Sequence, residues 1–119
     1  MGFRQNLENP PTGIHAGVKY LNFLRGYFES EINADERMWF ALASYNAGIG
    51  HVSDARRLTR QLGLNPNIWF GNVERAMLLL SKPQYARQAR YGYVRGSEPV
   101  AYVREIRDRH KAYLQCTGD

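Results

Sequence analysis

A chain of 119 residues with a formal net charge of +5 is long enough to bury one hydrophobic core, and its 44% of hydrophobic residues argues against intrinsic disorder. The single cysteine excludes an intrachain disulfide and a cysteine-based metal site. No run of about 18 apolar residues occurs, so no membrane-spanning helix is predicted. The positive charge allows an anionic partner, but the arginines are spread along the chain, which disfavours nucleic acid.

The first residues, 1–11, are predicted to be an irregular lead-in to a single domain that covers residues 1–119, because Asn and Pro break regular structure there. This segment is polar and lacks the apolar core of a signal peptide, so no export signal is expected in the chain. From Ile14 to Phe28, apolar residues recur at three- and four-residue steps, which predicts an amphipathic helix. The polar stretch 29–35 should connect it to the next helix.

The second predicted helix begins after a cap at Asn33 or Asp35 and is apolar around most of its circumference. It ends with Tyr45, Asn46 and Gly48. An aromatic hydroxyl and an amide beside a glycine-opened backbone suit a flat polar ligand such as a sugar. The alternative is that Asn46 and Gly48 only cap the helix.

Three further helices are predicted in the rest of the chain. One covers residues 52–62 and ends at Gly63, the next covers residues 68–80, and the last begins at a cap, Ser97, and reaches Leu114. Residues 85–91 are short and Arg-rich, and residues 92–96 form a glycine-bracketed turn. Because no stretch alternates with the period of a strand, the predicted fold class is all-α.

Three stretches follow one another in an order that resembles a known family. They are NP at residues 9–10 with GIHAGVKYL at 13–21, ASYNAG at 43–48, and SEPVAYV at 97–103. They resemble the motifs of bacterial lytic murein transglycosylases, which belong to the soluble-lytic-transglycosylase, lysozyme-like superfamily. WFAL at 39–42, DARR at 54–57 and NPN at 65–67 are most similar to the membrane-bound type F subgroup.

The resemblance implies a mainly helical, lysozyme-like lobe with a groove for alternating N-acetylglucosamine and N-acetylmuramic acid. It also implies non-hydrolytic cleavage of the β-1,4 bond, in which the C6 hydroxyl of muramic acid attacks its own C1 and leaves a 1,6-anhydro end. One glutamic acid acts first as general acid and then as base. Neither cofactor nor metal is implied, and the family acts in the periplasm or at the outer membrane.

The catalytic glutamate of the family stands in a Glu-Ser motif that precedes the first of these stretches, and no such motif precedes residue 9 here. The chain is therefore expected to be a truncated domain that lacks its N-terminal helices and has little activity alone. Glu29 with Ser30 is a poor substitute, because it follows the first stretch and lies in a polar connection.

Carried over motif by motif, Tyr45 and Asn46 match the Tyr-Asn pair of the family groove, and the small residues after them let a ligand approach the backbone. Tyr102 matches the tyrosine of the last motif, although it could be a core aromatic. Glu98 matches the acid of that motif, although it could instead only interact with the helix dipole in the first turn. The predicted substrate-binding residues are Tyr45, Asn46, Ala47, Gly48, Tyr93, Glu98 and Tyr102.

Two rival functions stay open. The first is a non-catalytic module that only binds peptidoglycan or chito-oligosaccharides, and the less favoured second is a basic helical nucleic-acid-binding domain. The three histidines have no metal-ligand spacing. Without its N-terminal helices the fragment would expose the face that carries Trp39, Leu42 and Tyr45, so a homodimer is a further expectation.

Overall fold

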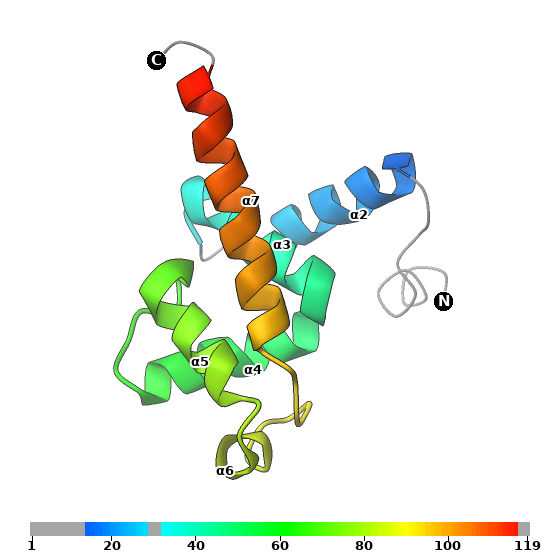
Figure 1. Ribbon diagram of the computed structural model, residues 1–119. Coiled ribbons are helices and arrows are strands. Elements are labelled where there is room, and N and C mark those ends of the chain that lie inside the picture. Colours follow the sequence, from blue (N-terminus) through cyan, green and yellow to red (C-terminus); the bar gives the residue numbers. More distant parts are fainter. Residues whose placement is uncertain (1–13, 29–31, 117–119) are drawn as a thin grey trace.

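The computed structural model describes residues 14–28 and 32–116, and every regular element in those ranges is a helix (Figure 1). The elements are α2 (Ile14–Tyr27), α3 (Ala34–Ala47), α4 (Ile49–Gln61), η1 (Trp69–Val73), α5 (Glu74–Leu79), α6 (Pro83–Ala86) and α7 (Ser97–Cys116). The all-α prediction is therefore confirmed. The lead-in at 1–11 and the Glu29-Ser30 pair lie outside the described residues.

Helix α3 is the centre of the arrangement. It packs most extensively against α7 and α2, and α4 continues from its end, while α2 projects sideways from the body (Figure 1). Phe40 of α3 is fully buried and meets the buried Trp69 ring edge-on, with 5.6 Å between ring centroids. Val52 of α4 and Val103 of α7 complete the same core. Burial of such side chains supplies most of the free energy of folding.

The joint between α3 and α4 is a single residue, Gly48. Its φ of 104° lies where residues with a Cβ are strained, and its N–H donates to the Ser44 carbonyl at 2.8 Å. Helix α4 begins at Ile49, earlier than the first apolar position, Val52, had suggested. At the other end Gly63, with a φ of 77°, follows the helix as predicted.

The single helix predicted over residues 68–80 is wrong, because the chain kinks inside η1, before α5 begins. Phe70 and Gly71 are non-helical, and Gly71 has a φ of 76°. Two carboxylates stabilise this geometry, one from α3 and one from the first residue of α5. Glu36 accepts a hydrogen bond from the Trp69 N–H at 2.8 Å, and Glu74 accepts one from the Gly71 N–H at 3.2 Å.

The predicted helix caps hold only in part. Asn33 precedes α3, but its side chain makes no capping hydrogen bond. Ser97 is the first residue of α7 rather than its cap. Gly96 directly precedes Ser97. A Cβ on residue 96 would lie 1.9 Å from the Met77 carbonyl oxygen, so only glycine fits where the start of α7 packs against α5.

The exposed face expected on α3 is wrong for Leu42, which is buried in the main core at 5% exposure. Trp39 is half-buried and meets the Phe70 ring at 5.2 Å. Of these α3 side chains, Tyr45 is the most exposed, at 36%. The last turn of α3 is therefore where this helix presents an aromatic surface.

Candidate functional site

Three tyrosines from three helices meet beside the end of α3. Tyr45 lies at 5.7 Å from Tyr20 of α2, measured between ring centroids, with the rings tilted by 54°. Burial raises the pKa of both Tyr20 and Tyr102, and the nearby Tyr45 phenol raises each further. Tyr102 of α7 is thus close enough to Tyr45 for the Tyr45 phenol to affect the pKa of Tyr102. We call Tyr20, Tyr45 and Tyr102 the tyrosine cluster.

The position of Tyr45 depends on a small residue in the neighbouring helix. Its hydroxyl oxygen lies 3.0 Å from where a Cβ on Gly17 would be, so α2 passes closely over the phenol. One part of the Tyr45 ring is covered by α2 and the rest stays open to solvent. An amphipathic ring held in this way can pack on a sugar and still offer a hydroxyl.

The turn after Tyr45 has the features that the sequence predicts. Asn46 is exposed, whereas Ala47 and Gly48 are half-buried. An exposed amide next to backbone with little side-chain cover can bond a hydroxyl or acetamido group of a sugar. Tyr45, Asn46, Ala47 and Gly48 are therefore consecutive residues at the end of α3. Tyr45 lies beside Tyr20 and Tyr102.

The other two predicted residues lie in a separate group before and at the start of α7. Tyr93 is 60% exposed, and the Glu98 carboxylate accepts from Arg95 at 3.3 Å. Glu98 first, and then Tyr93, raise the pKa of the Arg95 guanidinium. Among the described contacts, none joins Tyr93 or Glu98 to the tyrosine cluster. Glu98 is occupied by a surface ion pair with Arg95.

Sequence analysis missed Tyr91, whose ring packs on Gly50 in the first turn of α4. The nearest ring carbon lies 2.8 Å from where a Cβ on Gly50 would be, and the residue is 55% exposed. Asp54 accepts hydrogen bonds from the N–H groups of Arg90 and Tyr91. The second glycine of the Gly48-Ile49-Gly50 run was the available signal, since such a glycine marks a close approach.

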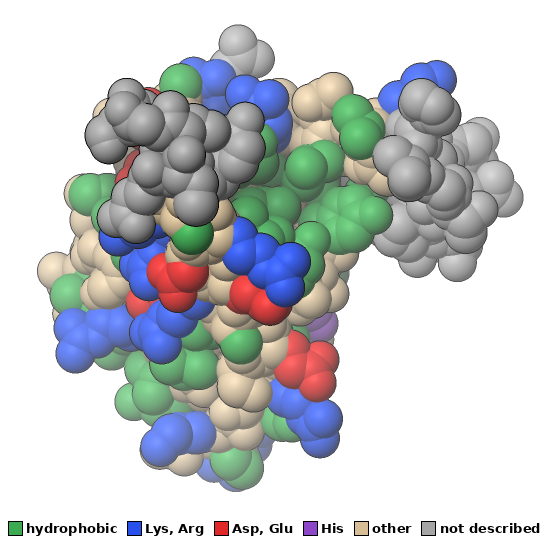
Figure 2. Space-filling model, turned by 45° about the horizontal axis from the view of Figure 1, so that its top comes forward, with side chains coloured by type: hydrophobic (Ala, Val, Ile, Leu, Met, Phe, Trp, Pro, Cys, Tyr) green, Lys and Arg blue, Asp and Glu red, His purple; other side chains and the backbone are tan. Residues whose placement is uncertain are grey.

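Hydrophobic side chains gather in a band between α7 and α2 (Figure 2). On α2, Val18 is 54% exposed, and Tyr45 at the end of α3 is 36% exposed. Scattered exposed apolar residues are ordinary, but an apolar band beside polar groups is typical of a binding surface.

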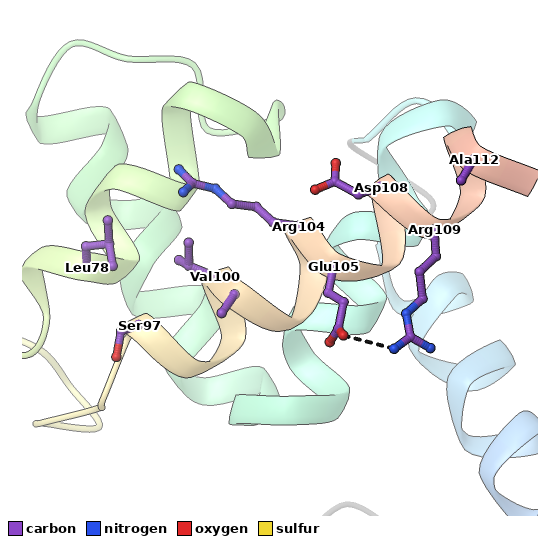
Figure 3. A pocket seen from close by; sticks show the side chains of 9 residues that line it. Leu78, Ser97, Val100, Arg104, Glu105, Asp108, Arg109 and Ala112 are labelled. Atoms are coloured by element: carbon purple, nitrogen blue, oxygen red, sulfur yellow. Dashed lines mark hydrogen bonds and ion pairs between the residues drawn. The ribbon is translucent and has the colours of Figure 1, made fainter. Parts of the chain in front are cut away.

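A separate groove of about 680 Å³ runs along α7 (Figure 3). Leu78 and Val100 line it with apolar surface, while Arg104 bonds Glu74 and Arg109 bonds Glu105. Neither Tyr45 nor Tyr102 lines this groove. Arg104, Glu105 and Arg109 in its lining all have ion-pair partners, so the groove offers a ligand less unpaired polar chemistry than the end of α3 does.

Within residues 14–28 and 32–116, no group of His, Cys, Asp and Glu side chains could hold a metal ion. No helix in the same ranges is long and apolar enough to cross a bilayer. The buried Nδ1 of His51 has no hydrogen-bond partner in the described part of the chain.

The fold defines a helical, lysozyme-like domain, and sequence comparison gives its family. Residues 2–68 match the family model described as Transglycosylase SLT domain, which is more than half of the chain. The chain therefore belongs to the SLT transglycosylase domain family. The resemblance seen in the three motifs is confirmed.

Similar proteins from three bacteria share one name, membrane-bound lytic murein transglycosylase F. Over 107 residues the chain is 48% identical to membrane-bound lytic murein transglycosylase F of Shewanella loihica and 47% identical to that of Shewanella halifaxensis. It is 44% identical to the Pseudomonas fluorescens protein over the same length. These matches cover 90% of this chain but 22% of each relative. The chain thus spans less than a quarter of the length of these relatives.

Proposed function

We propose that this chain forms part of the glycan-binding groove of a peptidoglycan lytic transglycosylase, with Tyr45 and Asn46 at its centre. The observation that carries the proposal is the tyrosine cluster, which holds a half-covered phenol directly before an exposed amide and a glycine turn. Membership in the SLT family and the names of the relatives support the same substrate, murein.

Each residue of the turn has a separate role in this proposal. The Tyr45 ring packs against the CH face of a sugar while its hydroxyl donates a hydrogen bond. The Asn46 amide bonds an N-acetyl group, and Ala47 and Gly48 leave room for the sugar ring to approach. Tyr102 supports Tyr45 from α7. Tyr93 and Glu98 lie apart from the tyrosine cluster. They are proposed to contact sugars farther along the same glycan strand.

The reaction proposed for the domain is an internal displacement without water. The C6 hydroxyl attacks C1 of muramic acid while an acid protonates the leaving oxygen, and the same group, now a base, takes the C6 proton. Among the described residues, the buried carboxylates of Asp54 and Glu74 already bond backbone N–H groups and an arginine. We therefore assign binding to this part of the chain and no acid or base.

Binding to intact peptidoglycan sacculi tests the proposal. The fraction of chain that sediments with sacculi should fall for Tyr45→Ala and Asn46→Ala. Loss of one stacking contact worth about 1.4 kcal/mol lowers affinity about tenfold. Tyr27→Ala is the matched control, since Tyr27 is also an exposed tyrosine but lies on α2 away from the turn. Equal loss for Tyr45→Ala and Tyr27→Ala, or no loss for either, would contradict the proposal.

The rival functions predict different responses in the same assay. A non-catalytic glycan-binding module would show the same mutational pattern but would lack activity in every longer form of the protein. A nucleic-acid-binding domain would show affinity that falls steeply with salt, because bound phosphates release counterions. Sugar stacking should change little with salt.

Two assignments beyond the site follow from the relatives and from the apolar band. The relatives are named membrane-bound, so a periplasmic location at the outer membrane is proposed for the protein. Val18 is an exposed apolar side chain on α2, which supports a homodimer through that helix. Sedimentation velocity tests the dimer, and a strictly monomeric species would contradict it.

A further inference from the structure

We propose that Tyr91 is a second sugar-stacking platform beside the end of α3, and that the buried carboxylate of Asp54 positions it. The proposal rests on the proposed glycan-binding function. Nothing in the family motifs discussed above includes residues 90–91, so the assignment depends on the contacts in this structure.

The ring of Tyr91 lies flat on the backbone of α4. A Cβ on Gly50 would lie 2.8 Å from Cγ and 2.9 Å from both Cδ1 and Cδ2 of Tyr91. Nearly equal distances to these three atoms place that point over the face of the ring rather than at its edge. One face of Tyr91 therefore contacts the helix, while 55% of the residue stays exposed and the Arg90 guanidinium carbon lies over the ring, 5.7 Å from its centroid. A fixed ring with exposed surface is what stacking on a pyranose needs.

Asp54 fixes the segment that carries this ring. Its Oδ2 accepts from the Tyr91 N–H at 2.8 Å, and its Oδ1 accepts from the Arg90 N–H at 3.1 Å. Arg57 donates to the same Oδ1 at 2.6 Å. Asp54 is only 3% exposed, so these three bonds satisfy a carboxylate that would otherwise be costly to bury. Two bonds to consecutive N–H groups leave the backbone at Tyr91 little freedom.

The same face of α4 provides both contacts. Gly50 and Asp54 are four residues apart, so they lie one above the other on the helix. Asp54 holds the backbone of residues 90–91 while Gly50 leaves the space for the ring. Directly afterwards Gly92, with a φ of 77°, turns the chain away. Gly50, Asp54 and Gly92 thus each constrain the exposed ring of Tyr91 or its backbone.

Tyr91 also lies next to the proposed site. Gly50 is in the first turn of α4, and Gly48 alone separates that helix from α3. Gly50, against which the Tyr91 ring packs, therefore follows Gly48 by less than one helical turn. Two aromatic platforms on either side of a glycine turn would bind consecutive sugars of one glycan strand.

The test is an NMR titration of the full 119-residue chain with the N-acetylglucosamine tetramer. Tyr91→Leu keeps an apolar contact on Gly50 but removes the flat ring, and it should weaken binding about tenfold. Tyr91→Phe keeps the ring and should bind as the wild type does. Gly50→Ala should act like Tyr91→Leu, because its Cβ displaces the ring. Tyr27→Ala is the matched control and should leave the affinity unchanged.

The role of Asp54 needs a separate readout, because its replacement could act through stability alone. Asp54→Asn should weaken tetramer binding in the wild-type background and cause no further loss in the Tyr91→Leu background. Loss in both backgrounds would show a general structural effect and would overturn the positioning role. Thermal unfolding of each variant checks that the fold is retained.

The outcomes separate this inference from the proposed function. If Tyr45→Ala weakens tetramer binding and Tyr91→Leu does not, the glycan site stands and the Tyr91 platform is wrong. If both variants weaken binding and Tyr91→Phe does not, both proposals are supported. Absence of any binding by the wild-type chain overturns both.

Discussion

The hydroxyl of Tyr45 lies 3.0 Å from the position that a Cβ would take on Gly17. This approach joins the two helices that form one side of the candidate site, since Gly17 belongs to α2 and Tyr45 to α3. Tyr20, one turn along α2 from Gly17, contacts the same phenol. The packing of α2 therefore decides where the Tyr45 hydroxyl points.

Gly17→Ala tests this relationship. The added methyl group must push the Tyr45 hydroxyl by a few tenths of an ångström, so affinity for N-acetylglucosamine oligomers should fall. Gly26→Ala is the control, because it lies in the same helix with nothing within 4 Å of its Cβ position. Gly26→Ala should stabilise the fold by about 0.5–1 kcal/mol and leave binding unchanged. Equal binding by the two variants would contradict the proposed role of Gly17.

Glu74 is predicted to stabilise the kink inside η1. Its carboxylate accepts from the Gly71 N–H and from Arg104 at 2.7 Å, and the side chain is 6% exposed. Glu74→Ala leaves that N–H without its acceptor, and the free energy of unfolding should fall by about 2 kcal/mol. Glu105→Ala, which breaks the exposed pair with Arg109, should cost less than about 0.5 kcal/mol. Urea denaturation measures both, and similar losses would show that the buried carboxylate has no special role.

The tyrosine cluster predicts a loss of stability at alkaline pH. Burial first, and then Tyr45, raise the folded-state pKa of Tyr20 and Tyr102 above the ordinary value of about 10. Their stabilising contribution is complete below the unfolded-state pKa and is lost as the pH rises through the folded-state pKa. Denaturation measured from about pH 9 upward should show constant stability to about pH 10 and a decline above it.

Tyr45→Phe provides the control for the alkaline effect. It removes the charge that forms on Tyr45 but leaves the burial of Tyr20 and Tyr102 in place. The pKa of each should therefore fall part of the way toward its ordinary value, as followed by tyrosinate absorbance. An unchanged titration would mean that the three phenols are farther apart than the structure places them.

The purified chain is expected to release no 1,6-anhydro-muropeptides from sacculi. The buried carboxylates of the described residues are already bonded by backbone N–H groups and arginines, and Glu98 is an exposed partner of Arg95. Mass spectrometry of the soluble products measures this. Product would contradict the account, and Glu29→Gln and Glu98→Gln would then identify the acid.

The sequence predicted most helices because local periodicity determines them. Helices α2, α4 and α7 each carry an apolar face at helical spacing. Tyr45, Asn46 and Tyr102 stay predicted site residues, which the sequence could suggest because their motifs are local. The kink at Gly71 was missed because one of its stabilising acceptors, Glu36, stands 33 residues before Trp69. Tyr91 was missed for the same reason, since its N–H is bonded by Asp54, which is 37 residues away. The single domain over 1–119 stays a prediction.

The most direct test of the central claim is to map amide shifts of the chain while N-acetylglucosamine oligomers or soluble muropeptides are added. The account predicts that the shifts cluster at Tyr45, Asn46 and Tyr102. Shifts confined to the α7 groove around Leu78 and Val100, or no shifts at saturating sugar, would contradict it.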